Sequence, residues 1–421
     1  MSESVSTLDD ACDWSPKRRG LAITAVPATF APTPWRGETT PTLSDLTTLG
    51  VGGPIKTYVE VDTERDFIDA ISSADAEGKP VLVLGGGSNL VAPDEGFDGV
   101  VVRDLRREID VVDDSACGGA TVRVSAGMPL DELVVRAIEE GWMGLESLSG
   151  IPGSVGAAPV QNVGAYGHEV SEVISSVATW DRLTGQRHHM PLSELAFGYR
   201  TSVLKRTGVR GGPPMEVTGR WVVTSVEFAF RHATLSAPVA YRQLAEHMGV
   251  AVGERVDSVR VREAVLDLRR GKGMVLDPAD PDTHSAGSFF TNPVLTTAGA
   301  EGLPPEAPRY PVYDYTARRN IADEAPIVDD RVKTSAAWLI AHAGIDRGER
   351  IEPNAPVAIS SKHTLALARV GHARAVDVRL LADHVVEAVR ERFGITLTPE
   401  PAFFDAKGRL AWDRLHTGSE K

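Results

Sequence analysis

Residues 150–167 read GIPGSVGAAPVQNVGAYG and hold five glycines among small, apolar neighbours. Flexible linkers favour Ser, Glu and Lys, so this composition is not typical of a linker. Glycine-rich apolar chain can pack closely against a flat partner, because no Cβ atoms keep the backbone away. We therefore expect this stretch to line a ligand site.

Two more glycine-rich stretches precede it, TTLGVGGP at 47–54 and LGGGSNL at 84–90. The second follows the apolar run VLVL at 81–84 and offers consecutive backbone N–H groups, which suit a phosphate. It matches neither the G-x-G-x-x-G nor the G-x-x-x-x-G-K-S/T fingerprint, and a strand followed by three glycines is by itself more often a tight turn. A large cofactor with a diphosphate and a planar ring would use all three stretches.

The periodicity of the rest of the chain predicts a mixture of strands and helices. We expect strands over 57–62, 81–84, 120–127, 177–182 and 221–230, and helices over 63–78, 129–141, 258–270, 334–344 and 373–394. Residues 1–37 lack sustained periodicity and carry several prolines, which predicts a loosely ordered extension. The change from strands to amphipathic helices predicts a domain boundary near residue 235.

The composition of the whole chain excludes several classes of protein. Its 421 residues, 42% of them hydrophobic, are typical of a globular protein with more than one domain. A net charge of -14 argues against nucleic acid and anionic membrane surfaces as partners. With only Cys12 and Cys117, and with His188 and His189 adjacent rather than at ligand spacing, we expect no metal site. No window has the length of a membrane helix and the N-terminus reads poorly as a signal peptide, so we expect a cytoplasmic protein.

Six motifs together carry a resemblance to a known family. They are TTLGVGGP (47–54), VLGGGSNLV (83–91), GIPGSVGAAPVQNVGAYG (150–167), FGYRTSVLK (197–205), AGSFFTNP (286–293) and TPEPAF (398–403). From about residue 43 to residue 405 the chain resembles the UDP-N-acetylenolpyruvoylglucosamine reductases, flavoenzymes that complete UDP-N-acetylmuramic acid for peptidoglycan. The resemblance implies an α+β fold, in which an FAD-binding domain of the vanillyl-alcohol oxidase type, in two subdomains, precedes an α+β substrate-binding domain.

The resemblance also implies how the chain is divided. After the extension at 1–37, we expect FAD-binding subdomain 1 at 38–105 and subdomain 2 at 106–235. The substrate-binding domain is expected at 236–390. A C-terminal segment, 391–421, is expected to return to the FAD domain and to carry Glu400.

Two cofactors follow from the same resemblance: FAD, which we expect to be bound noncovalently, and NADPH as hydride donor. The expected FAD-binding residues belong to the second and third glycine-rich stretches. They are Gly85, Gly86, Gly87, Ser88, Asn89, Gly150, Ile151, Pro152, Gly153, Ser154, Gly156, Ala157, Gln161, Asn162, Gly164, Ala165 and Tyr166.

Three residues are implied as catalytic. In the family, hydride passes through the flavin to the β-carbon of an enolpyruvyl ether and leaves an enolate, which must be stabilised and protonated at the α-carbon. Arg200 is expected to polarise the substrate carboxylate, although an arginine in this setting is by itself usually a surface or salt-bridge residue. Glu400 is expected to hydrogen-bond the enolate when protonated. Ser288 is the expected proton donor, whereas a lone serine between glycine and aromatics is otherwise more often buried and bonded to backbone.

The substrate, UDP-N-acetylglucosamine enolpyruvate, is expected to contact Tyr199 and Asn292. Tyr241 resembles the tyrosine of a loop that folds over the uridine in one subfamily, although the residues after it differ. Lys272, in RRGKGM, is the candidate for a diphosphate-binding lysine, with a spacing that departs from the family's. Besides this substrate and NADPH we expect no partner, and we expect a monomer.

Two alternative functions remain open at this point. Another oxidase on the same FAD fold would explain the glycine-rich stretches but not the set Arg200, Ser288 and Glu400, and it would release peroxide. A nucleotide-sugar sensor would bind uridine nucleotides without consuming NADPH.

Overall fold

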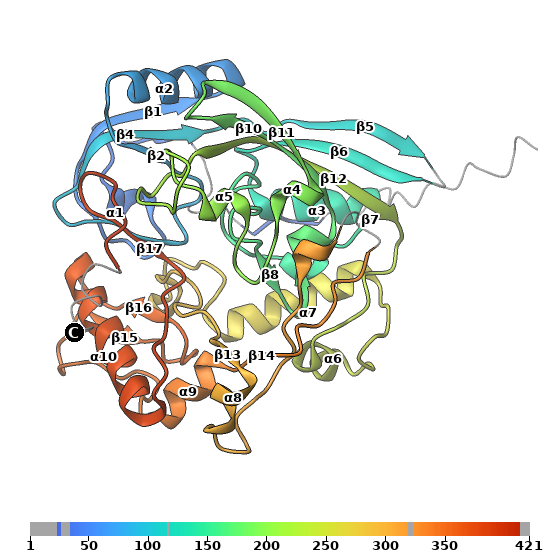
Figure 1. Cartoon of the computed structure of the whole chain (residues 1–421), viewed down its shortest axis with the longest axis vertical. Helices are drawn as coiled ribbons and strands as arrows, with labels where there is room; N and C mark the ends of the chain where they lie inside the picture. The colour runs from blue at the N-terminus through green and yellow to red at the C-terminus, as the bar shows by residue number, and fades with distance from the viewer. Residues whose placement is uncertain (1–22, 27–33, 116–117, 319–322, 413–421) are drawn as a thin grey trace, which may run out of the picture.

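The computed structural model describes residues 23–26, 34–115, 118–318 and 323–412. Its first unit begins with α1 (Leu43–Leu46) and is built on a parallel sheet of β1 (Ile55–Val61), β4 (Phe97–Asp104) and β2 (Val81–Val83), in that order. Helix α2 (Glu64–Ala76) lies over this sheet (Figure 1). It begins where the Thr63 hydroxyl accepts a hydrogen bond from the Asp66 N–H, and it buries Phe67 and Ile71. The predicted strand–helix–strand pattern is confirmed, but β4, the strand between β1 and β2 in the sheet, is not among the predicted strands.

The second unit is an antiparallel sheet. Its strands are β5 (Ile109–Ser115), β6 (Gly119–Ser125), β10 (Ile174–Asp181), β11 (Gln186–Pro191) and β12 (Trp221–His232), in the order β11-β10-β12-β6-β5. Helix α3 (Leu130–Glu140) packs its apolar residues into one core with the strands and ends at Gly141, whose φ is +71°. The short helices α4 (Leu192–Leu195) and α5 (Val203–Arg206) lie between β11 and β12 in the chain.

The glycine-rich stretch 150–167 runs between α3 and β10. It is bordered by β7 (Trp142–Met143) and the 3-10 turn η2 (Glu146–Leu148) on one side, and it ends in the small hairpin of β8 (Gly164–Ala165) and β9 (His168–Glu169), followed by η3 (Val170–Glu172). The stretch is therefore ordered against the second unit, as expected of chain that is not a linker.

The third unit is mainly helical. Its elements are α6 (Arg242–Met248), α7 (Ser258–Gly271), η4 (Pro281–Thr283), α8 (Thr297–Glu301), η5 (Tyr315–Ala317), α9 (Ala336–His342) and α10 (Ala375–Phe393), with the hairpins β13–β14 (Val294–Thr296 and Arg331–Lys333) and β15–β16 (Val357–Ile359 and Leu367–Arg369). Helices α9 and α10 share a core with β15 and β16. Helix α7 instead lies beside the second unit (Figure 1), where Arg262 forms an ion pair with Asp131 of α3.

The end of the described chain returns to the first unit. Strand β17 (Ala402–Phe403) pairs in parallel with β3 (Leu90–Val91), which follows the second glycine-rich stretch. Of the predicted extension, residues 23–26 and 34–37 are described, and Val26 N–H donates to the Asp131 carboxylate at 2.8 Å. No helix in the described part of the chain is long and apolar enough to cross a membrane.

Candidate active site

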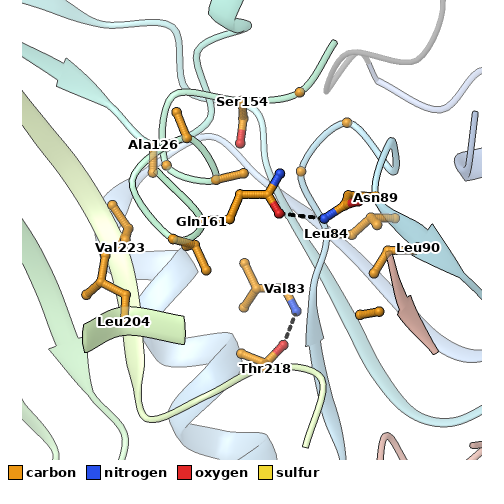
Figure 2. Close-up of a pocket in the computed structure, with 18 of the residues that line it drawn as sticks. Val83, Leu84, Asn89, Leu90, Ala126, Ser154, Gln161, Leu204, Thr218 and Val223 are labelled. Carbon is orange, nitrogen blue, oxygen red and sulfur yellow. Dashed lines mark hydrogen bonds between the residues drawn. The ribbon is translucent and has the colours of Figure 1, made fainter. Parts of the chain in front are cut away.

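A cavity of about 350 Å³ lies between the first two units, where glycine-rich stretches meet (Figure 2). Of the predicted FAD-binding residues, those that line it are Gly85, Gly86, Gly87, Ser88, Asn89, Pro152, Gly153, Ser154, Gly156, Ala157 and Gln161. The others, Gly150, Ile151, Asn162, Gly164, Ala165 and Tyr166, do not. Across the cavity Asn89 donates a hydrogen bond to Gln161 at 2.7 Å, which joins the two stretches.

The loop at 85–88 is shaped for a ligand that lies against main chain. Among the described residues, the backbone N–H groups of Gly85 through Ser88 find no hydrogen-bond acceptor. A Cβ on Gly85 would lie 2.8 Å from the Ser154 hydroxyl and would narrow the space between the stretches. Unpaired N–H groups without side-chain obstruction form an anion cradle, so these residues fit the diphosphate of a dinucleotide.

Asn162 supports the site without lining the cavity. Its side chain is fully buried and accepts a hydrogen bond from Ser171 N–H, while it donates to Glu169 at 2.6 Å and to the Gly198 carbonyl at 3.2 Å. Its φ of +48° is a left-handed conformation that Asn tolerates better than most residues. Asn162 therefore ties the end of the glycine-rich stretch to the chain before Arg200.

Arg200 is held from three directions. Its guanidinium donates to the carbonyls of Gly164 at 2.8 Å and Asn162 at 3.4 Å, and its Nε lies 3.3 Å from Glu400 Oε1. The approach to Glu400 is an ion-pair contact without hydrogen-bond geometry, so the buried Nε–H has no hydrogen-bond partner among the described residues. Burial works against the charge, but the carboxylates of Glu400 and Glu169 outweigh it and raise the pKa of Arg200. Arg200 is therefore a permanent cation whose guanidinium is fixed by two backbone carbonyls beside the Glu400 carboxylate.

Ser288 and Glu400 are brought together by backbone pairing. The N–H of Glu400 donates to the carbonyl of Phe289 at 2.8 Å, one residue after the half-buried Ser288. The N–H of Ala402 then donates to the carbonyl of Asn89 at 3.0 Å. Segment 398–402 thus lies between the serine motif and the glycine loop, and Glu400 lines the cavity.

Tyr199 and Asn292 link the arginine motif to the serine motif. The Tyr199 hydroxyl accepts a hydrogen bond from Asn292 N–H at 3.2 Å, and Asn292 Oδ1 accepts one from Ala336 N–H at the start of α9. Lys333 Nζ lies 4.4 Å from the centre of the Tyr199 ring. The Tyr199 ring is therefore contacted by the neighbouring Arg200 and by Lys333 of β14.

Tyr241 and Lys272 gather around Tyr166, away from that link. The rings of Tyr166 and Tyr241 lie 5.7 Å apart, edge to face, and Lys272 Nζ lies 5.7 Å from the centre of the Tyr166 ring. Lys272 also donates to Gln243, and burial lowers its pKa. The structure thus brings together two groups of predicted residues, one around Arg200 and one around Tyr166.

Sequence reasoning missed two ionisable residues of this region, Glu169 and Lys333, and it placed a third, Lys205, near Arg200 without assigning it a role. Lys205 lines the cavity beside Glu400, and its Nζ donates to the Arg200 carbonyl at 3.3 Å. Glu169 lies two residues after GAYG, so proximity to that motif could have identified it. Lys333 has no such signal. In the described part of the chain, no three His, Cys, Asp or Glu side chains are placed to hold a metal ion.

Comparisons with known proteins agree with this geometry. Residues 55–190 match the FAD binding domain family, and residues 278–404 match the C-terminal domain of UDP-N-acetylenolpyruvoylglucosamine reductase. The chain is 46% identical to the UDP-N-acetylenolpyruvoylglucosamine reductase of Cutibacterium acnes over 87% of this chain and 89% of that protein. It is 45% identical to the Thermobifida fusca reductase of the same name, over 85% of this chain and 95% of that protein.

A solved structure of a reductase from this family has a similar fold. The crystal structure of the UDP-N-acetylenolpyruvylglucosamine reductase of Thermus caldophilus has a TM-score of 0.55 and 27% identity, and the match covers 86% of this chain and 97% of that one. The two family matches include the glycine-rich stretches at 84–90 and 150–167 and the segments that carry Ser288 and Glu400. This chain belongs to the UDP-N-acetylenolpyruvoylglucosamine reductase family.

Proposed function

We propose that the protein reduces UDP-N-acetylglucosamine enolpyruvate to UDP-N-acetylmuramate, a step in the synthesis of the peptidoglycan precursor, with NADPH as reductant and noncovalently bound FAD. The observation that carries the proposal is the Arg200–Glu400 pair, 3.3 Å apart, in which Glu400 lines a cavity whose glycine loop has N–H groups that find no acceptor among the described residues. An oxidase of a hydroxylated small molecule has no need for this pair. We also propose a monomer that acts in the cytoplasm, where NADPH and nucleotide sugars are made.

The cofactor's diphosphate would bind at the loop of Gly85 to Ser88, and Gln161, Lys205 and Glu400, which line the same cavity, would border the rest of the cofactor. When bound, FAD supplies a carrier that accepts hydride from NADPH and delivers it to the substrate's β-carbon. The protein's share of the chemistry is to orient the substrate, exclude water and handle charge and protons.

We assign charge stabilisation and proton transfer to Arg200, Glu400 and Ser288. Arg200 pairs with the substrate carboxylate through its guanidinium, and so stabilises the negative charge that spreads from the α-carbon. Glu400, whose Oε1 lies 3.3 Å from Arg200 Nε, donates a hydrogen bond to the enolate once it is protonated. The Ser288 hydroxyl gives its proton to the α-carbon, beside the buried rings of Phe289 and Phe290, which keep competing water away.

Four further residues are proposed for substrate binding. Tyr199 and Asn292, already in contact, would border the enolpyruvyl end near Arg200. Tyr241 and Lys272, which both lie next to Tyr166, would meet the nucleotide end. Lys272 offers the cation that the diphosphate requires in a protein of net charge -14.

The direct test is to purify the protein, record its visible spectrum and follow NADPH absorbance with and without UDP-N-acetylglucosamine enolpyruvate. We expect flavin bands that are released on denaturation, and NADPH consumption that depends on the substrate. Rapid reoxidation by oxygen with peroxide release would favour the oxidase. Uridine-nucleotide binding without NADPH consumption would favour the sensor.

Ser288→Ala separates the proposed proton donor from a structural serine. Flavin reduction by NADPH should stay nearly unchanged, while reduction of the enolpyruvyl substrate should slow about 10²- to 10⁴-fold, because only this half-reaction needs the proton. Stopped-flow absorbance of the flavin measures both. Ser285→Ala, which removes a hydroxyl that accepts from Gly287 N–H in the same motif, controls for local disturbance. Equal losses in both half-reactions would make Ser288 structural.

A further inference from the structure

Glu169 contacts the same two residues, Asn162 and Gly164, whose carbonyls bind Arg200. It belongs to β9, which pairs with β8, and Gly164 and Glu169 are opposite each other in that hairpin. Its Oε2 accepts a hydrogen bond from Asn162 Nδ2 at 2.6 Å. The two backbone carbonyls that accept hydrogen bonds from the Arg200 guanidinium belong to Asn162 and Gly164. The same two residues therefore contact both Arg200 and Glu169.

The groups that face Glu169 come from four parts of the chain. Arg200 and Lys333 of β14 favour its charged form, whereas Glu172 of η3 opposes it. Burial raises the pKa of the phenols of Tyr199 and of Tyr315 in η5, and the charge of Glu169 adds to the rise at both. Burial dominates at Glu169 itself and raises its pKa to about 7, so the carboxyl changes charge in the neutral range.

We propose that Glu169 is a positioning residue that balances the charge of Arg200 while the site is free of substrate, and that it takes up a proton from solvent when the substrate carboxylate pairs with Arg200. The inference rests on the proposed function, because it requires an anionic substrate at Arg200. It adds a third carboxyl group to the reaction's charge balance, besides Glu400 and the substrate's own.

The reason is electrostatic. Arg200 already faces two carboxylates, and a third anion that pairs with it places another negative charge near Glu169. Protonation of Glu169 relieves the repulsion and leaves its hydrogen bond intact, because a neutral carboxyl still offers a carbonyl oxygen to Asn162 Nδ2. His168, the neighbouring titratable residue, directs Nδ1 to Glu172 and Nε2 to the Pro238 carbonyl, away from Arg200.

Proton uptake can be measured without turnover. The holoenzyme is titrated with UDP-N-acetylglucosamine enolpyruvate, in the absence of NADPH, in a calorimeter at pH 7 in two buffers of different ionisation enthalpy. If the pKa rises by one unit, a carboxyl that is half protonated becomes about nine-tenths protonated, so we expect uptake of about 0.4 proton per site. The dissociation constant should rise by up to about tenfold as the pH passes from 6 to 9.

Glu169→Gln keeps the size of the side chain and an oxygen for Asn162 but cannot titrate. We expect it to abolish the proton uptake and to flatten the pH dependence of substrate affinity. Glu194→Gln, which neutralises an exposed glutamate paired with His188, should retain both. Uptake that persists in Glu169→Gln, or a wild-type protein that binds substrate without uptake, would overturn the inference. Wild-type protein that fails to bind this substrate would instead refute the proposed function.

Discussion

Asp131→Asn removes one charge from a buried junction and should destabilise the protein strongly. The Asp131 carboxylate accepts hydrogen bonds from Arg262 at 2.7 and 2.8 Å, from Gly150 N–H at 2.6 Å and from Val26 N–H at 2.8 Å. The Arg262 side chain is only 2% exposed. Without the Asp131 carboxylate the buried Arg262 charge has no anionic partner, which lowers the free energy of unfolding by about 3–5 kcal/mol. The NH₂ group of the new asparagine would also face an N–H donor where the carboxylate offered an acceptor.

The same substitution should also weaken flavin binding. Gly150 begins the glycine-rich stretch, and the bond from its N–H fixes where that stretch leaves α3 before it reaches the cavity at Pro152. Urea unfolding, followed by tryptophan fluorescence and by release of the flavin, measures both effects. Glu132→Gln, which removes a partly exposed partner of Arg107, is the matched control and should cost less than about 1 kcal/mol.

A double-mutant cycle with Arg262→Met tests the cause. With the cation gone, Asp131→Asn should cost about 2–3 kcal/mol less than it does alone. Burial opposes the charge of Asp131, but the bonds from Arg262, Gly150 and Val26 outweigh it and lower its pKa. The contribution is therefore fully present above the unfolded pKa of about 3.9 and is lost as the pH falls through the folded value. A loss equal to that of the control at pH 7 would refute the reasoning.

Two other substitutions test the glycine loop and a buried histidine. Gly87→Ala should yield purified protein without flavin, because Gly87 has a φ of +62° and a Cβ there would lie 1.9 Å from a backbone oxygen. The control Gly78→Ala, at a φ of +66° but in open space, should lower the free energy of unfolding by only about 1–2 kcal/mol and keep the flavin. Flavin absorbance after gel filtration measures the bound cofactor in both variants. His168→Gln should destabilise the protein by about 1.5–3 kcal/mol at pH 6, because both ring nitrogens face acceptors. Burial disfavours the imidazolium, but Glu172 outweighs this and raises the pKa of His168, so the difference in denaturation midpoint should shrink as the pH rises through that value; a pH-independent difference would contradict this.

The elements that sequence patterns predicted best are those whose signals are local. Helix α2 has its cap and apolar face within one stretch, and α10 ends at Gly394, as its sequence predicts. Strand β5 escapes prediction because its residues are largely exposed, with aspartates among them, and it gains its partner only from β6. Such a strand is specified by the edge it joins rather than by its own pattern.

In the candidate site, too, features with a local sequence signal were predicted, whereas those that depend on distant parts of the chain were not. The role of the glycine loop at 85–88 was predicted from the three glycine-rich stretches taken together, since close approach of backbone favours glycine. The direction of a polar side chain does not follow, and Asn162, expected among the FAD-binding residues, directs its amide to Glu169 and Gly198 instead. Its place in the site was predictable from the motif, but its contacts depend on chain beyond the stretch, out to Gly198.

The two prolines around Glu400 have a physical role that joins these observations. Pro399 and Pro401 have no N–H group, so segment 399–402 has only two backbone donors, at Glu400 and Ala402. Both are used, one on the serine motif at 2.8 Å and one on the glycine loop at 3.0 Å. A segment between two neighbours would otherwise bury donors without acceptors. The distance from Glu400 to Ser288 is therefore set mainly by backbone hydrogen bonds, and side-chain packing has only to direct the carboxyl toward Arg200.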